Sequence, residues 1–288
     1  MYNFILSQES LYPVVQLCAV LEVSRSAYYS FRSGSSYRLG VSEKEVETAI
    51  VNSFISHRRR YGVRRLVPEL AALGFALGNY KIRKVLQKHG LKAIQPRSFV
   101  PRTTDSRHPY PISPNLLLES PFPNQINLVV VGDITYIPLS AGNWAYLSVW
   151  LDLYSRKVIG WALADHMREE LIVNSLKKAL ISRTFSQSTI IHSDRGGQYA
   201  GKAFRNLLDK SKVVQSMSRA DNPYDNAFME SYFSRFKAEL LEGGAFECIE
   251  DAQTEIFEYI EMYYNPKRRH SALGYLSPVN FEKASITY

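Results

Sequence analysis

The chain has 288 residues, with 35 Lys and Arg against 27 Asp and Glu and a net charge of +8 at pH 7. Its length suits two or three domains, and its apolar content of 45% is that of a globular protein with packed cores. No apolar run approaches the roughly 18 residues of a membrane helix, and the N-terminus lacks the pattern of a secretory signal, so we expect no membrane contact. Cys18 and Cys248 lack metal-site spacing, which argues against a zinc site and fits a reducing cytoplasm.

The positive charge is unevenly placed along the chain. Residues 1–110 hold 17 Lys and Arg against 7 Asp and Glu, whereas residues 111–288 are close to neutral. A basic N-terminal part joined to a near-neutral remainder indicates an arm that binds a polyanion. A basic protein with no nucleic-acid role would have the same charge, so charge alone leaves both classes open.

Residues 1–40 are predicted to hold a short helix-turn-helix segment. An apolar stripe from Val14 to Leu21 predicts one helix, and Ser24 is a typical N-cap for a second. In such a motif the first residues of the second helix meet base edges in the major groove, so Arg25 is a candidate DNA contact. A plain helical hairpin is the alternative.

Residues 41–95 are predicted to form a homeodomain-like helical domain that binds DNA. Apolar positions indicate three helices, the second over residues 66–73 with Pro68 in its first turn, where proline is tolerated. Basic side chains cluster on the outside, where they would bind phosphates whatever the base sequence. The candidate contacts are Arg58, Arg59, Arg60, Arg64, Arg65 and Lys84. A solvated basic face is the competing interpretation.

Residues 96–123 are predicted to be a proline-rich linker, because this much proline blocks regular helix and central strand. Residues 124–288 then change to a pattern of strands followed by alternating helices and strands. Three strands with short connections imply antiparallel pairing, and the later helix–strand alternation implies a mixed sheet. The expected fold class is α/β, with a five-stranded sheet and helices on both faces. The predicted strands are Leu128–Ile137, Trp144–Asp152, Lys157–Ala164, Thr189–Ser193 and Val213–Met217.

Three carboxylates in this part are candidate metal ligands. Asp133 lies in an apolar strand, where a charge is costly to bury unless it is paired or bound to a cation. Asp194 ends another apolar strand, the position where ligand sites form in α/β sheets. Glu230 lies near the start of an amphipathic helix, with Lys237 two turns later on nearly the same side. Oxygen ligands without a His/Cys cluster suit Mg²⁺ or Mn²⁺. Other triples among the 27 carboxylates have plausible spacing, and Asp152, Asp221 and Asp225 compete for these roles.

Several sequence motifs of the chain resemble those of insertion-sequence transposases with a retroviral-integrase-like core, the type whose second reading frame encodes the catalytic part. The motifs occur in the family's order, and 35 residues separate Asp194 from Glu230, as in that family. They are Gly132-Asp-Ile-Thr-Tyr-Ile137, Tyr146-Leu-Ser-Val-Trp-Leu-Asp152, His192-Ser-Asp-Arg-Gly-Gly-Gln-Tyr199, Asn222-Pro-Tyr-Asp-Asn-Ala-Phe-Met-Glu-Ser231 and Tyr264-Asn-Pro-Lys-Arg-Arg-His270. Two departures, at Val130 and at Ala220-Asp221, touch no expected ligand.

The resemblance implies an RNase H-like core whose DDE triad, Asp133, Asp194 and Glu230, holds metal, with two Mg²⁺ or Mn²⁺ ions expected. It implies cleavage at the ends of a mobile element and 3′-hydroxyl strand transfer into DNA, with Lys237 near the end DNA. The partners it implies are the terminal inverted repeats and target DNA, a homo-oligomer on paired ends, and fusion or complex with an upstream-frame DNA-binding protein. It places the chain in the bacterial cytoplasm, associated with the nucleoid when bound to DNA.

Two points stay open from the sequence. Arg268 and His270 match the family's C-terminal motif and are candidate DNA contacts, with a C-terminal cap as the alternative. An inactive DNA-binding repressor derived from a transposase is the alternative function. The intact triad argues against the repressor, and the tandem DNA-binding units argue against a general nuclease.

Overall fold

The N-terminal helices form a small unit with its own core. The computed structural model describes residues 1–34, 43–95, 109–118, 120–219, 226–241 and 244–286. Helices α1 (Tyr2–Gln8), α2 (Val14–Val20) and α3 (Arg25–Arg32) enclose the buried side chains of Ile5, Cys18 and Tyr28. The pair α2 and α3 lies where the helix-turn-helix was predicted, whereas α1 was not foreseen.

The second helical unit consists of α4 (Glu43–Ser56), α5 (Val63–Ala72) and α6 (Asn79–Lys88). Its core includes Ile50, Phe54, Leu66 and Ile82, all fully buried. One detail of the prediction is wrong. Helix α5 begins at Val63, so Pro68 lies inside the helix and not in its first turn, and its nitrogen has no hydrogen to donate to the carbonyl four residues earlier.

The C-terminal part is built on a five-stranded mixed sheet, as expected. Its strands are β1 (Val129–Pro138), β2 (Trp144–Asp152), β3 (Val158–Ala164), β4 (Ile190–Ser193) and β5 (Val214–Met217), in the order β3-β2-β1-β4-β5. The first three pair antiparallel, and β1–β4 and β4–β5 pair parallel. The expectation that the first and fourth strands are neighbours, on which the carboxylate site depends, is therefore confirmed.

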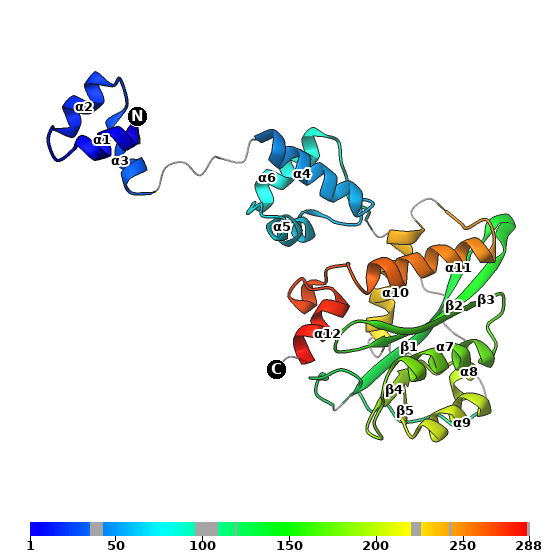
Figure 1. Cartoon of the computed structure of the whole chain (residues 1–288). Coiled ribbons are helices and arrows are strands. Elements are labelled where there is room, and N and C mark those ends of the chain that lie inside the picture. The colour runs from blue at the N-terminus through cyan, green and yellow to red at the C-terminus, as the bar shows by residue number, and fades with distance from the viewer. Residues whose placement is uncertain (35–42, 96–108, 119, 220–225, 242–243, 287–288) are drawn as a thin grey trace.

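Two helical layers cover the sheet (Figure 1). One face packs on α7 (Glu169–Ser182), α8 (Gly197–Ala200) and α9 (Lys202–Ser211), around the fully buried Trp150. The other face packs on α10 (Ala227–Leu240), α11 (Ile249–Phe257) and the π-helical turn η3 (Glu258–Tyr264) that continues it. Alternate residues of β1 reach opposite layers, because successive side chains of a strand point to opposite faces.

The remaining elements are short. Short 3₁₀ turns η1 (Ser140–Gly142) and η4 (Ser271–Leu273) and the final helix α12 (Pro278–Ile286) complete the fold. Part of the predicted proline-rich linker runs beside β5, where the Leu116 amide donates to Ser216 Oγ at 2.9 Å and the Met217 amide donates to the Pro114 carbonyl. Residues 96–108 of that linker lie outside the described residues.

Among the described residues, no helix is long and apolar enough to cross a membrane.

Candidate active site

Asp133 and Asp194 lie side by side at the centre of the sheet. Strand β1 pairs with β4 so that Val129, Val130 and Val131 face Ile190, Ile191 and His192. Continuing this register by two residues places Asp133 opposite Asp194, which directly follows β4, and adjacent strands lie about 4.8 Å apart. Val129, Val131 and Ile137 pack toward α10, so the alternation of β1 directs Asp133 to the same layer. Both aspartates are half-buried.

The proximity of the two carboxylates affects their ionisation. Burial and then the charge of Asp194 raise the pKa of Asp133 well above its usual range, and the charge of Glu230 acts in the same direction. The Ile134 amide, which donates to Asp133 Oδ1 at 2.7 Å, and the Asn226 side chain oppose this increase. Asp194 Oδ1 accepts from the Gly196 amide at 2.9 Å. Two partly desolvated carboxylates therefore lie close enough to repel each other when both are ionised.

Glu230 completes this group only in part. It lies in the first turn of α10, whose inward side chains Met229, Phe233 and Phe236 anchor the helix on the sheet, while Glu230 itself is exposed. Its charge acts on Asp133, yet in the described part of the chain no three His, Cys, Asp or Glu residues are close enough to hold one metal ion. The structure thus brings the two aspartates together and leaves Glu230 at the edge of the site.

The donor set fits a hard divalent cation. Carboxylate oxygens are the ligands that Mg²⁺ and Mn²⁺ prefer, and a cation would offset the repulsion and desolvation that raise the pKa of Asp133. Lys237, half-buried on α10, lies close enough to Asp133 for their charges to interact. Burial lowers its pKa, and the charge of Asp133 opposes that shift. A positive group is therefore held near the carboxylates, in reach of an anionic substrate.

Two further residues interact with these carboxylates and were not predicted. Asn226 precedes α10 in the N-cap position, yet its side chain makes no capping bond and instead contacts Asp133. Tyr199 is buried with no hydrogen-bond partner for its hydroxyl, and its pKa is raised by burial, then by the charges of Asp133 and Asp194. Asn226 could be predicted from its place in the motif that ends in Glu230, whereas Tyr199 looks like any core tyrosine.

The competing carboxylates have other positions. Asp152 is fully buried at the end of β2, where it accepts from the Asn127 amide at 2.7 Å and from the amide and hydroxyl of Ser155. These bonds make Asp152 part of a structural turn. Asp221 and Asp225 lie outside the described residues.

Comparison with known proteins places this core in a family. Residues 123–223 and 211–278 match the Integrase core domain, and residues 42–99 match an HTH-like domain. The chain is 35% identical over 288 residues to the transposase InsF for insertion sequence IS3A of Escherichia coli (strain K12), covering 99% of both chains. The chain belongs to this insertion-sequence transposase family. An uncharacterized 31 kDa protein of insertion element IS600 from Shigella sonnei is 37% identical over 267 residues, 93% of this chain and 97% of that protein.

Solved structures of retroviral integrases also align with this member of the transposase family. The HTLV-2 integrase catalytic core domain in complex with magnesium aligns over 55% of this chain and 98% of its own, with 13% identity and a TM-score of 0.42. A chain of the simian T-cell lymphotropic virus intasome in complex with PP2A regulatory subunit B56 gamma aligns over 75% of this chain and 69% of its own, with 17% identity and a TM-score of 0.40.

The predicted DNA-binding residues of this transposase-family chain fall into two groups. The exposed ones are Arg25, Arg58, Arg59, Arg64 and Lys84. The others are less accessible: Arg60 and Arg268 are buried, and Arg65 is half-buried beside Glu239. Burial and then the charge of Arg268 lower the pKa of His270 well below its usual range, so its imidazole is neutral at pH 7. For Arg268 and His270, this placement favours the structural alternative.

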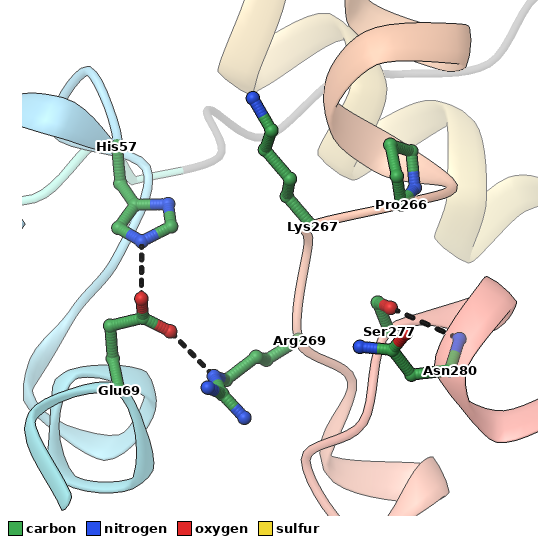
Figure 2. A pocket seen from close by; sticks show the side chains of 7 residues that line it. All are labelled: His57, Glu69, Pro266, Lys267, Arg269, Ser277 and Asn280. Atoms are coloured by element: carbon green, nitrogen blue, oxygen red, sulfur yellow. Dashed lines mark hydrogen bonds and ion pairs between the residues drawn. The ribbon is translucent and has the colours of Figure 1, made fainter. Parts of the chain in front are cut away.

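The HTH-like domain contacts the C-terminal segment at a cavity of about 230 Å³ (Figure 2). There Glu69 of α5 accepts from Arg269 Nε at 2.6 Å, and its other oxygen lies 3.5 Å from His57 Nε2. His57 stacks on Tyr61, with ring centroids 3.7 Å apart. The hydrogen bond to His57, followed by the one to Arg269, lowers the pKa of Glu69 to about 2. An ionised Glu69 therefore links the two parts of the chain.

We expect this contact to weaken in acid. A carboxyl group whose pKa is lowered by folding stabilises the folded chain above its unfolded pKa, near 4.5, and this contribution is lost as the pH falls toward 2. The Glu69→Gln variant should unfold at a lower urea concentration than the native chain at pH 7, and the difference should shrink at pH 3. Glu43→Gln, at a side chain that is 92% exposed, should show neither effect. An equal difference at both pH values would contradict an ionised Glu69.

Proposed function

We propose that the chain is a DNA transposase that cuts phosphodiesters at the ends of a mobile element and joins the freed 3′-hydroxyl to target DNA. The observation that carries this proposal is the pair Asp133 and Asp194 on neighbouring parallel strands in a transposase-family core. A non-catalytic DNA-binding protein has no need of two partly desolvated carboxylates that raise each other's cost of ionisation.

In this proposal Asp133, Asp194 and Glu230 hold divalent metal, Mg²⁺ or Mn²⁺, with two ions as the expected number. When bound, the metal activates the attacking oxygen and stabilises the leaving oxygen of a phosphodiester. The chain's own residues position the ligands. The Ile134 amide and the Asn226 side chain orient the Asp133 carboxyl group, and the Gly196 amide orients that of Asp194. Lys237 is placed to contact a phosphate of the end DNA.

Recognition of the element ends is assigned to the helical units before the core. The exposed side chains of Arg25, Arg58, Arg59, Arg64 and Lys84 are the proposed contacts to double-stranded DNA. The buried or half-buried side chains of Arg60, Arg65, Arg268 and His270 are not part of this proposed surface. Because phosphate contacts release counterions, end binding should weaken steeply with salt. Two ends must be brought together for transposition, so we propose a homo-oligomer on paired ends, acting alone or with an upstream-frame DNA-binding protein.

The test compares the native chain with Glu230→Gln on a labelled DNA fragment that carries the element's end, with Mg²⁺. We expect the variant to keep end binding and to lose nicking and joining, since it removes a charged ligand without changing the volume of the side chain. Glu247→Gln, at an exposed glutamate outside the site, should retain both activities. Equal activity of Glu230→Gln and native protein would exclude Glu230 as a ligand. End binding without cleavage in every protein, including a fusion with the upstream-frame partner, would favour the repressor.

A further inference from the structure

Glu239 forms a buried ion cluster near the C-terminal end of α10. Its side chain accepts from Arg268 Nη2 at 2.6 Å and Nε at 2.9 Å, and from the Tyr259 hydroxyl at 2.9 Å. Arg65 Nη1 lies 3.5 Å from the same carboxylate. Burial opposes the ionisation of Glu239, yet the bonds from Arg268 hold its pKa below the usual range. We name this group, with Arg60, the Glu239 clamp.

Two members of the clamp come from the HTH-like domain. Arg60, only 8% exposed, donates from Nε to the Glu239 carbonyl at 3.1 Å. Its guanidinium lies 4.6 Å from the ring centroid of Tyr263 and 5.0 Å from that of Tyr259. A desolvated cation over two rings gains cation–π attraction that a solvated one would not. Arg60 therefore anchors the HTH-like domain to the end of α10.

A second set of contacts joins the same two parts. The Tyr61 hydroxyl donates to the Lys267 carbonyl at 3.2 Å and accepts from the Arg269 amide at 2.7 Å. Glu69 holds the Arg269 side chain, as Figure 2 shows. The two acids are arranged reciprocally: Glu239 of the core takes a cation from the HTH-like domain, and Glu69 of that domain takes one from the C-terminal segment. This arrangement fixes orientation as well as contact.

The clamp and the proposed metal site share one helix. Glu239 follows Glu230 by nine residues on α10, which is about 13.5 Å along a helix axis. Building on the proposed function, we propose that the Glu239 clamp couples the end-binding domain to Glu230 and so determines which phosphodiester of the element's end is cut. Arg60, Arg65, Glu239 and Arg268 are then positioning residues, since none of them touches the reacting atoms.

A purely stabilising role explains the Glu239 clamp less well than a positioning role does. Burying charges costs free energy that the ion pairs repay only when their geometry is good, and apolar residues of similar volume often stabilise a fold equally well. The Arg268–Glu239 pair is bidentate and directional, and Arg60, 179 positions before Glu239, joins the HTH-like domain to this helix end through the Glu239 carbonyl. What such bonds add beyond burial is a defined orientation.

The test uses the full chain with Mg²⁺ and an end-labelled element end. Arg60→Met keeps much of the side chain's volume and removes its guanidinium. We expect the variant to bind the element's end with an affinity within about threefold of native. Its cleavage rate should fall by about 10²-fold, the effect of a misplacement of about 1 Å in an active site. Its cuts should be spread over neighbouring phosphodiesters. Lys44→Met, at an exposed cation of the same domain, should leave rate and cut position unchanged.

Two further measurements distinguish a loss of domain orientation from a failure of the proposed function. A spin label on the exposed Cys248 and another on Gln87→Cys should give a narrow distance distribution in the native chain and a broad one with Arg60→Met, whether or not DNA is cut. If Arg60→Met fails to fold, Tyr61→Phe, which removes only the bridging hydroxyl, should show the same changes in smaller measure. An active native chain whose folded variants cut the same phosphodiester at the native rate would overturn the coupling. Inactivity of the native chain would instead count against the proposed function.

Discussion

The Asp133→Asn variant is expected to fold and to lose DNA cleavage and strand transfer almost completely. Asp133 is the central carboxylate of the site, and metal stabilisation of a transition state provides several kcal/mol, so we expect a loss of about 10³-fold or more. The same substitution removes one of two crowded, partly desolvated negative charges. The metal-free variant should therefore melt slightly above the metal-free native chain, by about 2–4 °C for each kcal/mol relieved.

Thermal unfolding with and without Mg²⁺ separates this effect from a folding defect. Mg²⁺ should raise the melting temperature of the native chain, because a ligand that binds the folded state stabilises it, and should have little effect on Asp133→Asn. Asp152→Asn is the matched control on the neighbouring strand. It should lower stability, because Asp152 accepts bonds from Asn127 and Ser155, and should keep the response to Mg²⁺. A native Mg²⁺ shift that survives in Asp133→Asn would remove Asp133 from the metal site.

The strands of the core could be predicted because each carries its own apolar pattern. The observed strand bounds differ from the predicted ones by one residue at most at either end, and the antiparallel pairing of β1, β2 and β3 follows from their short connections. The position of Asp194 directly after a strand predicted a site at that strand's carboxyl end, and the parallel pairing of β1 and β4 places Asp133 beside it. Local pattern and strand adjacency were enough to predict that these two residues lie close together.

The buried role of Arg60 could not be predicted in the same way. Within Arg58-Arg59-Arg60 all three side chains look equally suited to phosphate, but Arg58 and Arg59 are exposed with positive φ, whereas Arg60 turns inward to a carbonyl 179 residues away. Contacts at that separation leave no periodic signal near the arginine. The overlooked signal is at the partner, because Glu239 follows Tyr232 and Phe236 on the apolar face of α10.

A charge on an apolar helical face requires a buried partner, and that rule applied to Glu239 would have predicted a cation from elsewhere in the chain. It would not have identified Arg268, Arg65 or Arg60, since the choice depends on tertiary contacts within the core and between two domains. A tertiary contact also determines the role of Asn226. Its side chain suits an N-cap locally, yet the tertiary contact with Asp133 takes precedence over the cap.

The Gly132→Ala variant is expected to destabilise the core and to displace the neighbouring Asp133. Gly132 pairs with Trp150 across β1 and β2, and an added Cβ would lie 2.7 Å from Cδ2 of the indole and closer still to two other ring carbons. Overpacking of this kind costs typically about 1–3 kcal/mol. We expect a lower urea midpoint and a reduced cleavage rate, whereas Gly78→Ala, at a position with open space for the Cβ, should change neither greatly.

The clash cannot be relieved by moving Trp150, and this makes Gly132 the more sensitive position. The indole is fully buried, donates from Nε1 to Ser175 Oγ at 2.9 Å and stacks on Phe204 at an interplanar angle of 10°. The backbone of β1 must shift instead, and Asp133 shifts with it. Trp150→Leu should therefore restore part of the lost cleavage when combined with Gly132→Ala, so that the two effects are not additive. Strict additivity of both stability and rate would show that the indole is not what excludes a side chain at residue 132.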